Sequence, residues 1–248
     1  MNIIKANITE IFSSLQGEGP HTGEPMTFVR FSGCSALCQW CDTEASLKHF
    51  ITYRVETPPR SKSFISYVNP VTVDKLNEHL TFFNDPTISV TGGEPLEQVN
   101  FLEAWLPIIK QNRKILLETN GIFYDALEAI AKNIDIISMD IKLPSSTGRK
   151  AYWNEHSTFL TKALQSGKET YVKIIVTPET SSKDMQEAIQ LISSANKYIS
   201  VILQPASATD KFHGKISDDQ IRSFERLCNL WLPNVSVMHQ MHKEAGLL

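Results

Sequence analysis

The strongest constraint on the fold is a series of short apolar runs that alternate with helical patterns along the 248-residue chain. Each run is rich in leucine or β-branched residues, is continuous rather than alternating, and is followed closely by Gly or Pro. Strands that are buried on both faces of a parallel sheet have this pattern. The runs span residues 26–33, 86–93, 114–121, 135–142, 171–178 and 198–205, and a shorter run spans 234–240. Helical patterns lie between them at 71–83, 98–112, 124–133, 156–167, 182–196 and 217–231.

Six strand–helix units in series predict a parallel sheet whose right-handed crossovers curl it into a barrel. The expected fold class is therefore α/β, a partial (open) parallel βα barrel of about six strand–helix units with an insertion after the cysteine loop. Residues 44–71 have basic, Pro and Ser content without a clear period, so we expect an insertion or a loop over one end of the barrel. Ser181 and Ser217 are the expected helix caps, and one domain spans 1–248.

Composition excludes several classes of protein. The chain is 42% hydrophobic, enough for a full core, and its net charge of −3 is not that of a polyanion-binding protein. The N-terminus has no long apolar run or small-residue cleavage site, and no segment reaches the roughly 20 apolar residues of a membrane span. We expect a soluble, cytoplasmic protein that does not bind nucleic acid.

The unusual residues of the chain follow the predicted strands. In parallel α/β folds the carboxyl ends of the strands meet at one edge, where ligands bind. We therefore expect these segments to form one site: the cysteine loop after the first strand, TGGEP (91–95), ETNG (118–121), SMDIK (138–142) and QP (204–205).

Three of the four cysteines, Cys34, Cys38 and Cys41, lie in one C-x3-C-x2-C loop. Such clustering indicates a metal or redox site. Three thiolates would hold a 4Fe–4S cluster and leave one iron open, because each iron takes one protein ligand. Zinc is the alternative, with Asp42 or His49 completing the site, and three small buried side chains are the structural alternative. Cys228 lies in a helical pattern and is expected in the core.

The cysteine spacing, with Trp40 before the last cysteine, resembles the cluster motif of the radical S-adenosylmethionine superfamily. The resemblance implies a 4Fe–4S cluster whose open iron binds S-adenosylmethionine, and a 5′-deoxyadenosyl radical that abstracts hydrogen from the substrate. TGGEP is similar to the Gly-Gly-Glu-Pro motif of that superfamily, although the same residues are also typical of a β-turn. The implied S-adenosylmethionine contacts are Gly93, Glu94, Ser138, Asp140, Lys142, Gln204, Pro205, Ala206 and Ser207.

The segment SLQGEG (14–19), followed by a Phe-Val-Arg-Phe strand and the cysteine loop, resembles the 7-carboxy-7-deazaguanine synthase family over essentially the whole chain. Members convert 6-carboxy-5,6,7,8-tetrahydropterin into 7-carboxy-7-deazaguanine and ammonia by radical ring contraction, in the biosynthesis of queuosine or another deazapurine. The implied substrate contacts are Leu15, Gln16, Gly17, Arg30, Thr91 and the terminal carboxylate at Leu248.

A pterin offers amino and ring N–H donors and a carboxylate. Gln16 and Glu18 supply acceptors for the donors, and Arg30 supplies a cation for the carboxylate. The structural alternatives are an exposed loop charge for Glu18 and an ion pair for Arg30. Glu118 and Asn120 are further candidates for the same pocket.

The family also implies magnesium bound by Thr43, since magnesium prefers oxygen ligands. The alternative is that Asp42 and Thr43 cap a following helix. The ending HQMHKEAGLL resembles the Gln-Thr-His-Lys ending of the family, with Met241 in place of Thr.

The resemblance further implies a homodimer and an external one-electron donor of flavodoxin or ferredoxin type. No residue is predicted to act as a catalytic acid or base, because the cofactor carries the reaction. Two alternatives remain: a glycyl-radical activase, which lacks the SLQGEG and CDT segments, and a zinc or iron–sulfur module without enzymatic activity, which leaves the strand-end motifs unexplained.

Overall fold

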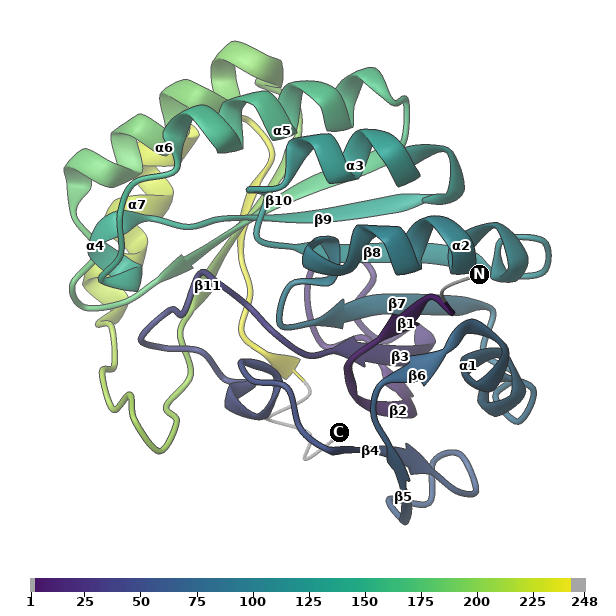
Figure 1. Ribbon diagram of the computed structural model, residues 1–248. Helices are drawn as coiled ribbons and strands as arrows, with labels where there is room; N and C mark the ends of the chain where they lie inside the picture. Colours follow the sequence, from purple (N-terminus) through teal and green to yellow (C-terminus); the bar gives the residue numbers. More distant parts are fainter. Residues whose placement is uncertain (1–2, 242–248) are drawn as a thin grey trace.

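The computed structural model describes residues 3–241 and shows a curved sheet with helices along its outer face (Figure 1). From β3 to β12 every neighbouring pair of strands is parallel, as the continuous apolar runs predicted. The α/β class and the open, mostly parallel barrel are confirmed. In this part of the chain the main sheet has the order β12 (Val235–Val237), β11 (Ser200–Pro205), β10 (Glu169–Val176), β9 (Ile136–Ile141), β8 (Lys114–Thr119), β7 (Thr87–Gly92), β3 (Pro25–Phe31), β2 (Ile8–Leu15), β4 (Thr52–Glu56) and β5 (Phe64–Val68).

The helices follow the parallel strands, and neighbouring helices pack side by side on the outer face (Figure 1). The predicted caps are present, since the hydroxyl of Ser181 accepts from the Asp184 N–H and that of Ser217 from the Gln220 N–H. The helices are α1 (Val73–Leu80), α2 (Val99–Ile109), α3 (Tyr124–Ile130), α4 (Pro144–Thr147), α5 (Trp153–Gln165), α6 (Ser182–Asn196) and α7 (Asp218–Asn229), with 3₁₀ turns at Glu44–Ser46, Pro95–Gln98 and Ala131–Asn133. None of these helices is long and apolar enough to cross a membrane.

The segment 44–71 matches the expected loop over the end of the barrel only at its start, where residues 44–47 line the cavity at that end. Residues 52–68 form the hairpin β4–β5, and β4 pairs in parallel with β2, so the hairpin extends the edge of the main sheet. Its strands are only five residues long and half exposed, which gives a weak sequence signal. A separate two-stranded sheet joins β1 (Lys5–Ala6) to β6 (Val71–Thr72).

A large apolar core fills the space between the sheet and the helices. Trp105 on α2 is fully buried in it, and its ring centroid lies 6.1 Å from those of Phe31 and Phe101. The indole N–H donates to Asn77 Oδ1 on α1 at 3.1 Å, so its one polar atom is satisfied. Trp105 thus joins β3, which leads into the cysteine loop, to two helices.

The burial of Trp105 predicts a large loss of stability when the side chain is truncated. Trp105→Ala leaves a cavity and should lower the free energy of unfolding by about 3–5 kcal/mol, measured by chemical denaturation. The control is Trp231→Ala, because Trp231 is 65% exposed and should change stability by no more than about 0.5 kcal/mol. Equal effects of the two substitutions would contradict the assignment of Trp105 to the core.

Candidate functional site

A cavity of about 470 Å³ lies at the carboxyl ends of the parallel strands. This volume is within the range of ordinary small-molecule sites. It brings together most of the predicted site residues: Leu15, Gln16, Gly17, Arg30, Cys34, Cys38, Cys41, Thr43, Thr91, Gly93, Asp140, Lys142, Gln204, Ala206 and Ser207.

The cysteine loop is held at the cavity by backbone contacts with the end of β7. The Glu94 N–H donates to the Gly33 carbonyl at 2.8 Å, and the Gly33 N–H donates to the Ser46 carbonyl at 2.7 Å. A Cβ on Gly93 would lie 2.1 Å from the Gly33 oxygen, so this close approach requires glycine. The TGGEP motif and the start of the cysteine loop are therefore in direct backbone contact.

The three cysteine side chains all line the cavity and are partly exposed. Burial, aided by the negative charge of Glu94, raises the pKa of the Cys34 thiol to about 11, and burial also raises the pKa of Cys38. Thiolates are the form that binds metals, so binding of a metal or cluster here would require proton release from these groups.

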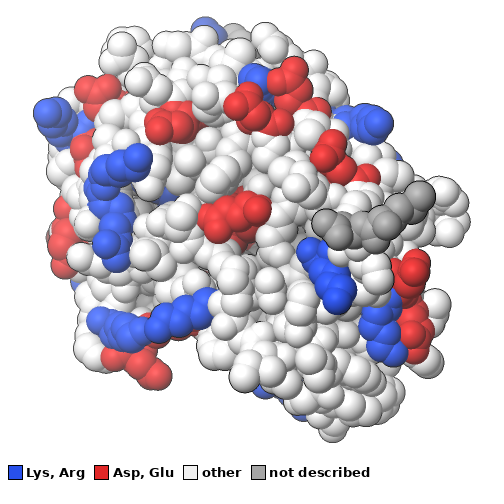
Figure 2. Space-filling model, viewed as in Figure 1, with Lys and Arg blue, Asp and Glu red and all other residues white. Residues whose placement is uncertain are grey.

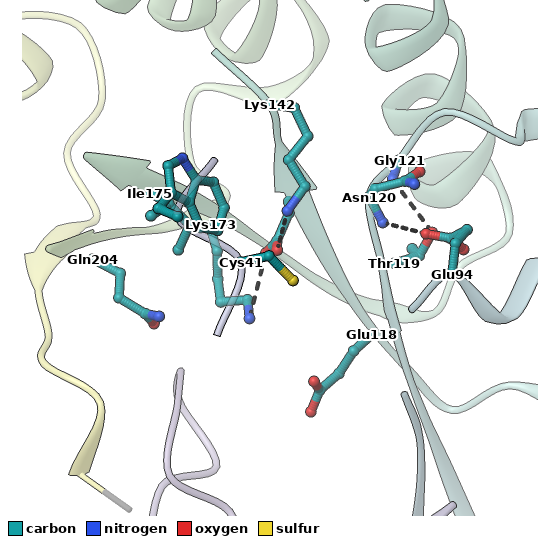
Figure 3. A network of polar contacts seen from close by, with 12 residues as sticks. Cys41, Glu94, Glu118, Thr119, Asn120, Gly121, Lys142, Lys173, Ile175 and Gln204 are labelled. Atoms are coloured by element: carbon teal, nitrogen blue, oxygen red, sulfur yellow. Dashed lines mark hydrogen bonds and ion pairs between the residues drawn. The ribbon is translucent and has the colours of Figure 1, made fainter. Parts of the chain in front are cut away.

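A network of four buried or partly buried charges crosses the cavity wall. Lys173 Nζ lies 2.6 Å from Glu18 Oε2 and 3.3 Å from Asp140 Oδ1, and Lys142 Nζ lies 2.8 Å from Asp140 Oδ2. Figure 3 shows the two lysine side chains converging from different strands. The pairing joins the SLQGEG loop to β9 and β10.

Burial favours the uncharged form of these groups, but their ion pairs favour the charged form more strongly. Burial acts to raise the pKa of Asp140, but Lys142 and Lys173 outweigh it and hold that pKa below its usual value. The pKa of Glu18 is likewise lowered, since Lys173 and a hydrogen bond from Gln240 outweigh burial and the charge of Asp42. Burial alone would lower the pKa of Lys173, yet its carboxylate neighbours raise it well above the usual range. All three groups are charged at neutral pH.

Glu94 lies behind the cavity wall rather than in it. Its carboxylate accepts from the Thr119 hydroxyl at 2.8 Å, from the Asn120 N–H at 2.7 Å and from the Leu96 N–H at 3.1 Å. Burial raises the pKa of Glu94 to about 7 in spite of these bonds. Figure 3 shows Glu94 beside the turn at Thr119–Gly121, which it holds in place.

Glu118 points into the cavity and is the meeting point of two predicted substrate contacts. Oε1 accepts from Gln16 Nε2 at 2.8 Å and from the Ser89 hydroxyl at 3.1 Å, while Oε2 accepts from the Thr91 hydroxyl at 2.8 Å. Gln16, Thr91 and Glu118 therefore form one polar surface.

Arg30 lines the cavity and also makes the ion pair that the structural alternative predicted. Its Nε donates to Glu10 Oε1 at 3.0 Å, and its guanidinium carbon lies 5.4 Å from the centroid of the Phe12 ring. Sequence reasoning did not identify Glu10, because an acidic residue in an exposed-looking strand has no distinctive signal.

The end of the described chain, at Gln240 and Met241, closes one side of the cavity. Gln240 Nε2 donates to Glu18 Oε1 and to Asp42 Oδ2, both at 2.6 Å, and the Met241 N–H donates to the Gly17 carbonyl at 3.1 Å. Gln240 thus joins the SLQGEG loop to the cysteine loop. Leu248, the predicted terminal contact, lies outside the described residues.

Several predicted residues take other positions. Glu94, Ser138 and Pro205 are not part of the cavity wall. The Thr43 side chain lines the cavity and makes no capping hydrogen bond to the 3₁₀ turn that follows it. His49, the proposed zinc ligand, contacts the Ser32 hydroxyl at 3.1 Å and does not line the cavity.

Two residues that sequence reasoning missed are central to the site, Lys173 and Gln240. A lysine inside the buried strand YVKIIVTP was a usable signal for Lys173, because a fully buried lysine requires a charged partner. Gln240 lies in the HQMHKEAGLL ending that resembles the family, but its contacts had no local signal, since its partners Glu18, Asp42 and Ser207 come from segments that are distant in sequence.

The wall fits a polar cofactor beside the thiols. Apart from Asp140 Oδ1, which is ion-paired with Lys173, four buried polar atoms of cavity-lining residues have no hydrogen-bond partner within residues 3–241: Thr9 Oγ1, Ser46 Oγ, Asn120 Nδ2 and Gln204 Oε1. Buried polar atoms in native proteins are normally satisfied, so these atoms are available to a ligand.

On the face seen in Figure 2, acidic and basic side chains are interspersed, without a large field of one sign.

Comparison with known proteins identifies a superfamily and, within it, similar proteins of one named type. The family model of the radical SAM superfamily matches residues 28–239. The 7-carboxy-7-deazaguanine synthase of Geobacter sulfurreducens is 34% identical and the alignment covers 98% of both chains; that of Methanocaldococcus jannaschii is 31% identical over 97% of this chain and 100% of its own.

Solved structures show the same fold at lower sequence identity. The chain is similar to QueE from Escherichia coli, with a TM-score of 0.59, 21% identity and coverage of 96% and 95% of the two chains. It is also similar to Streptococcus suis SuiB bound to S-adenosylmethionine, with a TM-score of 0.55, 15% identity and coverage of 83% and 48%.

The buried His156 predicts a specific pH dependence of stability. Its Nε2 contacts the Asn120 carbonyl at 3.1 Å, and burial lowers its pKa to about 4. At His156 the unfolded chain therefore binds more protons between pH 6.5 and pH 4, so this residue contributes a fall in the free energy of unfolding as pH decreases through that window, by at most about 1.4 kcal/mol per pH unit. The raised pKa of Glu94 acts in the opposite direction, so the contribution of His156 is read from the difference between wild type and a His156 variant. Denaturation of cluster-free protein at several pH values measures this slope.

His156→Asn removes the titrating ring and its contribution, so the free energy of unfolding of the variant should rise relative to that of the wild type as pH decreases from 6.5 to 4. The control is His213→Asn, because His213 is exposed and should leave the slope unchanged. An unaltered slope in the His156 variant would show that another group causes the dependence.

Proposed function

Because the chain belongs to the radical S-adenosylmethionine superfamily and, within it, to the 7-carboxy-7-deazaguanine synthase family, we propose that it converts 6-carboxy-5,6,7,8-tetrahydropterin into 7-carboxy-7-deazaguanine and ammonia. One structural observation carries the proposal beyond family membership. The cysteine loop, the ends of the parallel strands and the SLQGEG loop line a single cavity. A cofactor held by the thiols and a substrate held by the SLQGEG loop would therefore share one enclosed space.

The three thiols would hold a 4Fe–4S cluster, which together with S-adenosylmethionine supplies the radical that abstracts hydrogen from the substrate. Gly93, after β7, and Gln204, on β11, line the same cavity as the thiols, where they can contact the cofactor. Trp40 shields the loop, since its N–H donates to Ser146 Oγ at 3.0 Å and its ring lies 4.9 Å from Lys142 Nζ. Such enclosure excludes water from reactive intermediates.

The SLQGEG loop is well suited to a guanine-like edge. The carboxylates of Glu18 and Glu118 can accept hydrogen bonds from amino and ring N–H groups, and both are held in place by other side chains. Arg30 offers a cation to the substrate carboxylate. These contacts would orient the substrate and pair with its charged groups. The proposed reaction uses no acid or base from the protein.

The proposal includes magnesium, an electron donor and a second subunit. Thr43 would contribute a hydroxyl ligand to magnesium, and its Oγ1 lies 3.7 Å from Cys41 Sγ, so the metal would lie beside the cluster loop. The electron would come from an external flavodoxin or ferredoxin type protein, and a homodimer is expected from the family. The sequence resemblance supports these three points.

The cysteine assignment predicts a selective loss of iron. Single Ala substitutions of Cys34, Cys38 or Cys41 should each abolish the absorption band near 400 nm and reduce bound iron after anaerobic reconstitution, because each thiolate holds a different iron. Cys228→Ala is the matched control, since Cys228 is buried against Met185 on the outer side of the sheet and should leave iron content unchanged. One zinc per chain without an absorption band would contradict the cluster.

The activity itself is tested by anaerobic incubation of reconstituted enzyme with S-adenosylmethionine, reductant, magnesium and the carboxytetrahydropterin. Mass spectrometry should show a product lighter than the substrate by ammonia, formed without net consumption of S-adenosylmethionine. Omission of magnesium should lower the rate. Cleavage of the cofactor to 5′-deoxyadenosine with the pterin unchanged would overturn the proposed substrate, and turnover without S-adenosylmethionine would overturn the radical reaction.

A further inference from the structure

Glu10, at the rim of the cavity, is shared between two arginines. Its Oε1 accepts from Arg30 Nε at 3.0 Å, and its Oε2 accepts from Arg54 Nη2 at 2.5 Å. Arg30 lies on β3 and lines the cavity, whereas Arg54 lies on β4, in the hairpin that extends the sheet. The three side chains together carry one excess positive charge.

An irregularity in β2 brings this group to the cavity. The pairing of β2 with β3 shifts register between Ile8 and Glu10, so Thr9 is an extra residue in the strand. Such a bulge re-aims neighbouring side chains, and both Thr9 and Glu10 line the cavity. The Thr9 hydroxyl is buried and has no hydrogen-bond partner within residues 3–241.

Arg30 is the cation best placed to take a further anion. The described residues that line the cavity include two other cations, Lys142 and Lys173, and both are paired with carboxylates of the same wall. Within residues 3–241 the hydrogen bonds of the Arg30 side chain are limited to that from Nε to Glu10, which leaves both Nη nitrogens for a ligand. The Phe12 ring packs against the Arg30 guanidinium and stacks on the Phe28 ring, with 5.0 Å between the two ring centroids.

Without Arg54, the pair of Glu10 and Arg30 would carry no net charge. A carboxylate that pairs with one arginine cancels its charge, and an anionic ligand would then approach a neutral pair. Arg54 takes one of the two Glu10 oxygens and restores the excess charge. The Phe64 ring, 4.8 Å from the guanidinium carbon, holds Arg54 over the hairpin.

We propose that Arg54 is a positioning residue which acts through Glu10, so that the group around Arg30 keeps a net positive charge for the substrate carboxylate. The hairpin at 52–68 thereby contributes to the choice of an anionic pterin. The inference rests on the proposed function for the identity of the ligand, but the geometry of Arg54, Glu10 and Arg30 is independent of it.

The test measures binding rather than turnover. Reconstituted enzyme with S-adenosylmethionine is titrated anaerobically, without reductant, with 6-carboxy-5,6,7,8-tetrahydropterin or with 5,6,7,8-tetrahydropterin, which lacks the carboxylate. Arg54→Met keeps the apolar stem and removes the charge. It should weaken binding of the carboxylated pterin by about two- to fivefold, the range of a partly exposed charge pair, and leave the other pterin unchanged.

Rescue separates this role from simple support of the hairpin. Glu10→Gln removes the opposing charge while its amide oxygen can still accept from Arg30. The double variant Arg54→Met/Glu10→Gln should regain the wild-type preference for the carboxylated pterin, and Arg54→Lys should retain it. Arg222→Met is the control, because Arg222 is an exposed partner of Asp219 on α7.

The possible results are distinguishable. Equal affinities of wild type and Arg54→Met for the carboxylated pterin, weakening of both pterins alike, or a double variant no better than the single one would overturn the inference. If Arg54→Met does not fold, Glu10→Gln alone decides, since it should tighten binding of the carboxylated pterin relative to the other. If the wild type produces 7-carboxy-7-deazaguanine but the variants do not differ from it as expected, only the inference is overturned. A wild type that binds neither pterin overturns the proposed function as well.

Discussion

The contact between the end of β7 and the cysteine loop is the constraint on which the site depends. Gly93 and Glu94 bond to Phe31 and Gly33 through their backbone N–H groups, while the Glu94 carboxylate holds the turn after β8. A buried carboxylate is tolerated only when its acceptor capacity is used, as it is here. One short segment therefore aligns the loop of the first parallel strand with the end of the third.

The cavity also depends on a balance of charge. Two lysines and two carboxylates pair across β9, β10 and the SLQGEG loop, and desolvation makes each of these charges costly unless its partner stays in place. The same pairing leaves the arginine on the far side as the available cation. Closure of the wall and the availability of Arg30 are therefore consequences of one arrangement.

The barrel could be predicted because its strands are buried on both faces, and such strands have continuous apolar sequences that end at Gly or Pro. The strand β2 and the hairpin β4–β5 could not be predicted. The strand β2 is mostly buried but has several polar residues (ITEIFSSL), and the two strands of the hairpin, at the end of the sheet, are partly exposed. Their sequences mix polar and apolar residues, and their place in the sheet is set by pairing with distant segments. The register shift at Thr9 has no local sequence signal.

By itself the sequence determined the type of chemistry, because three cysteines in one loop after a strand, with a Gly-rich motif after the next, require only local spacing and strand order. It also determined that these motifs would meet, since parallel strands end at one edge. Only the tertiary structure decided which groups share charge: Lys173 with Glu18, Gln240 with Glu18 and Asp42, and Arg54 with Glu10. These pairs join residues far apart in the chain, and electrostatic interaction depends on distance in space rather than on separation in sequence.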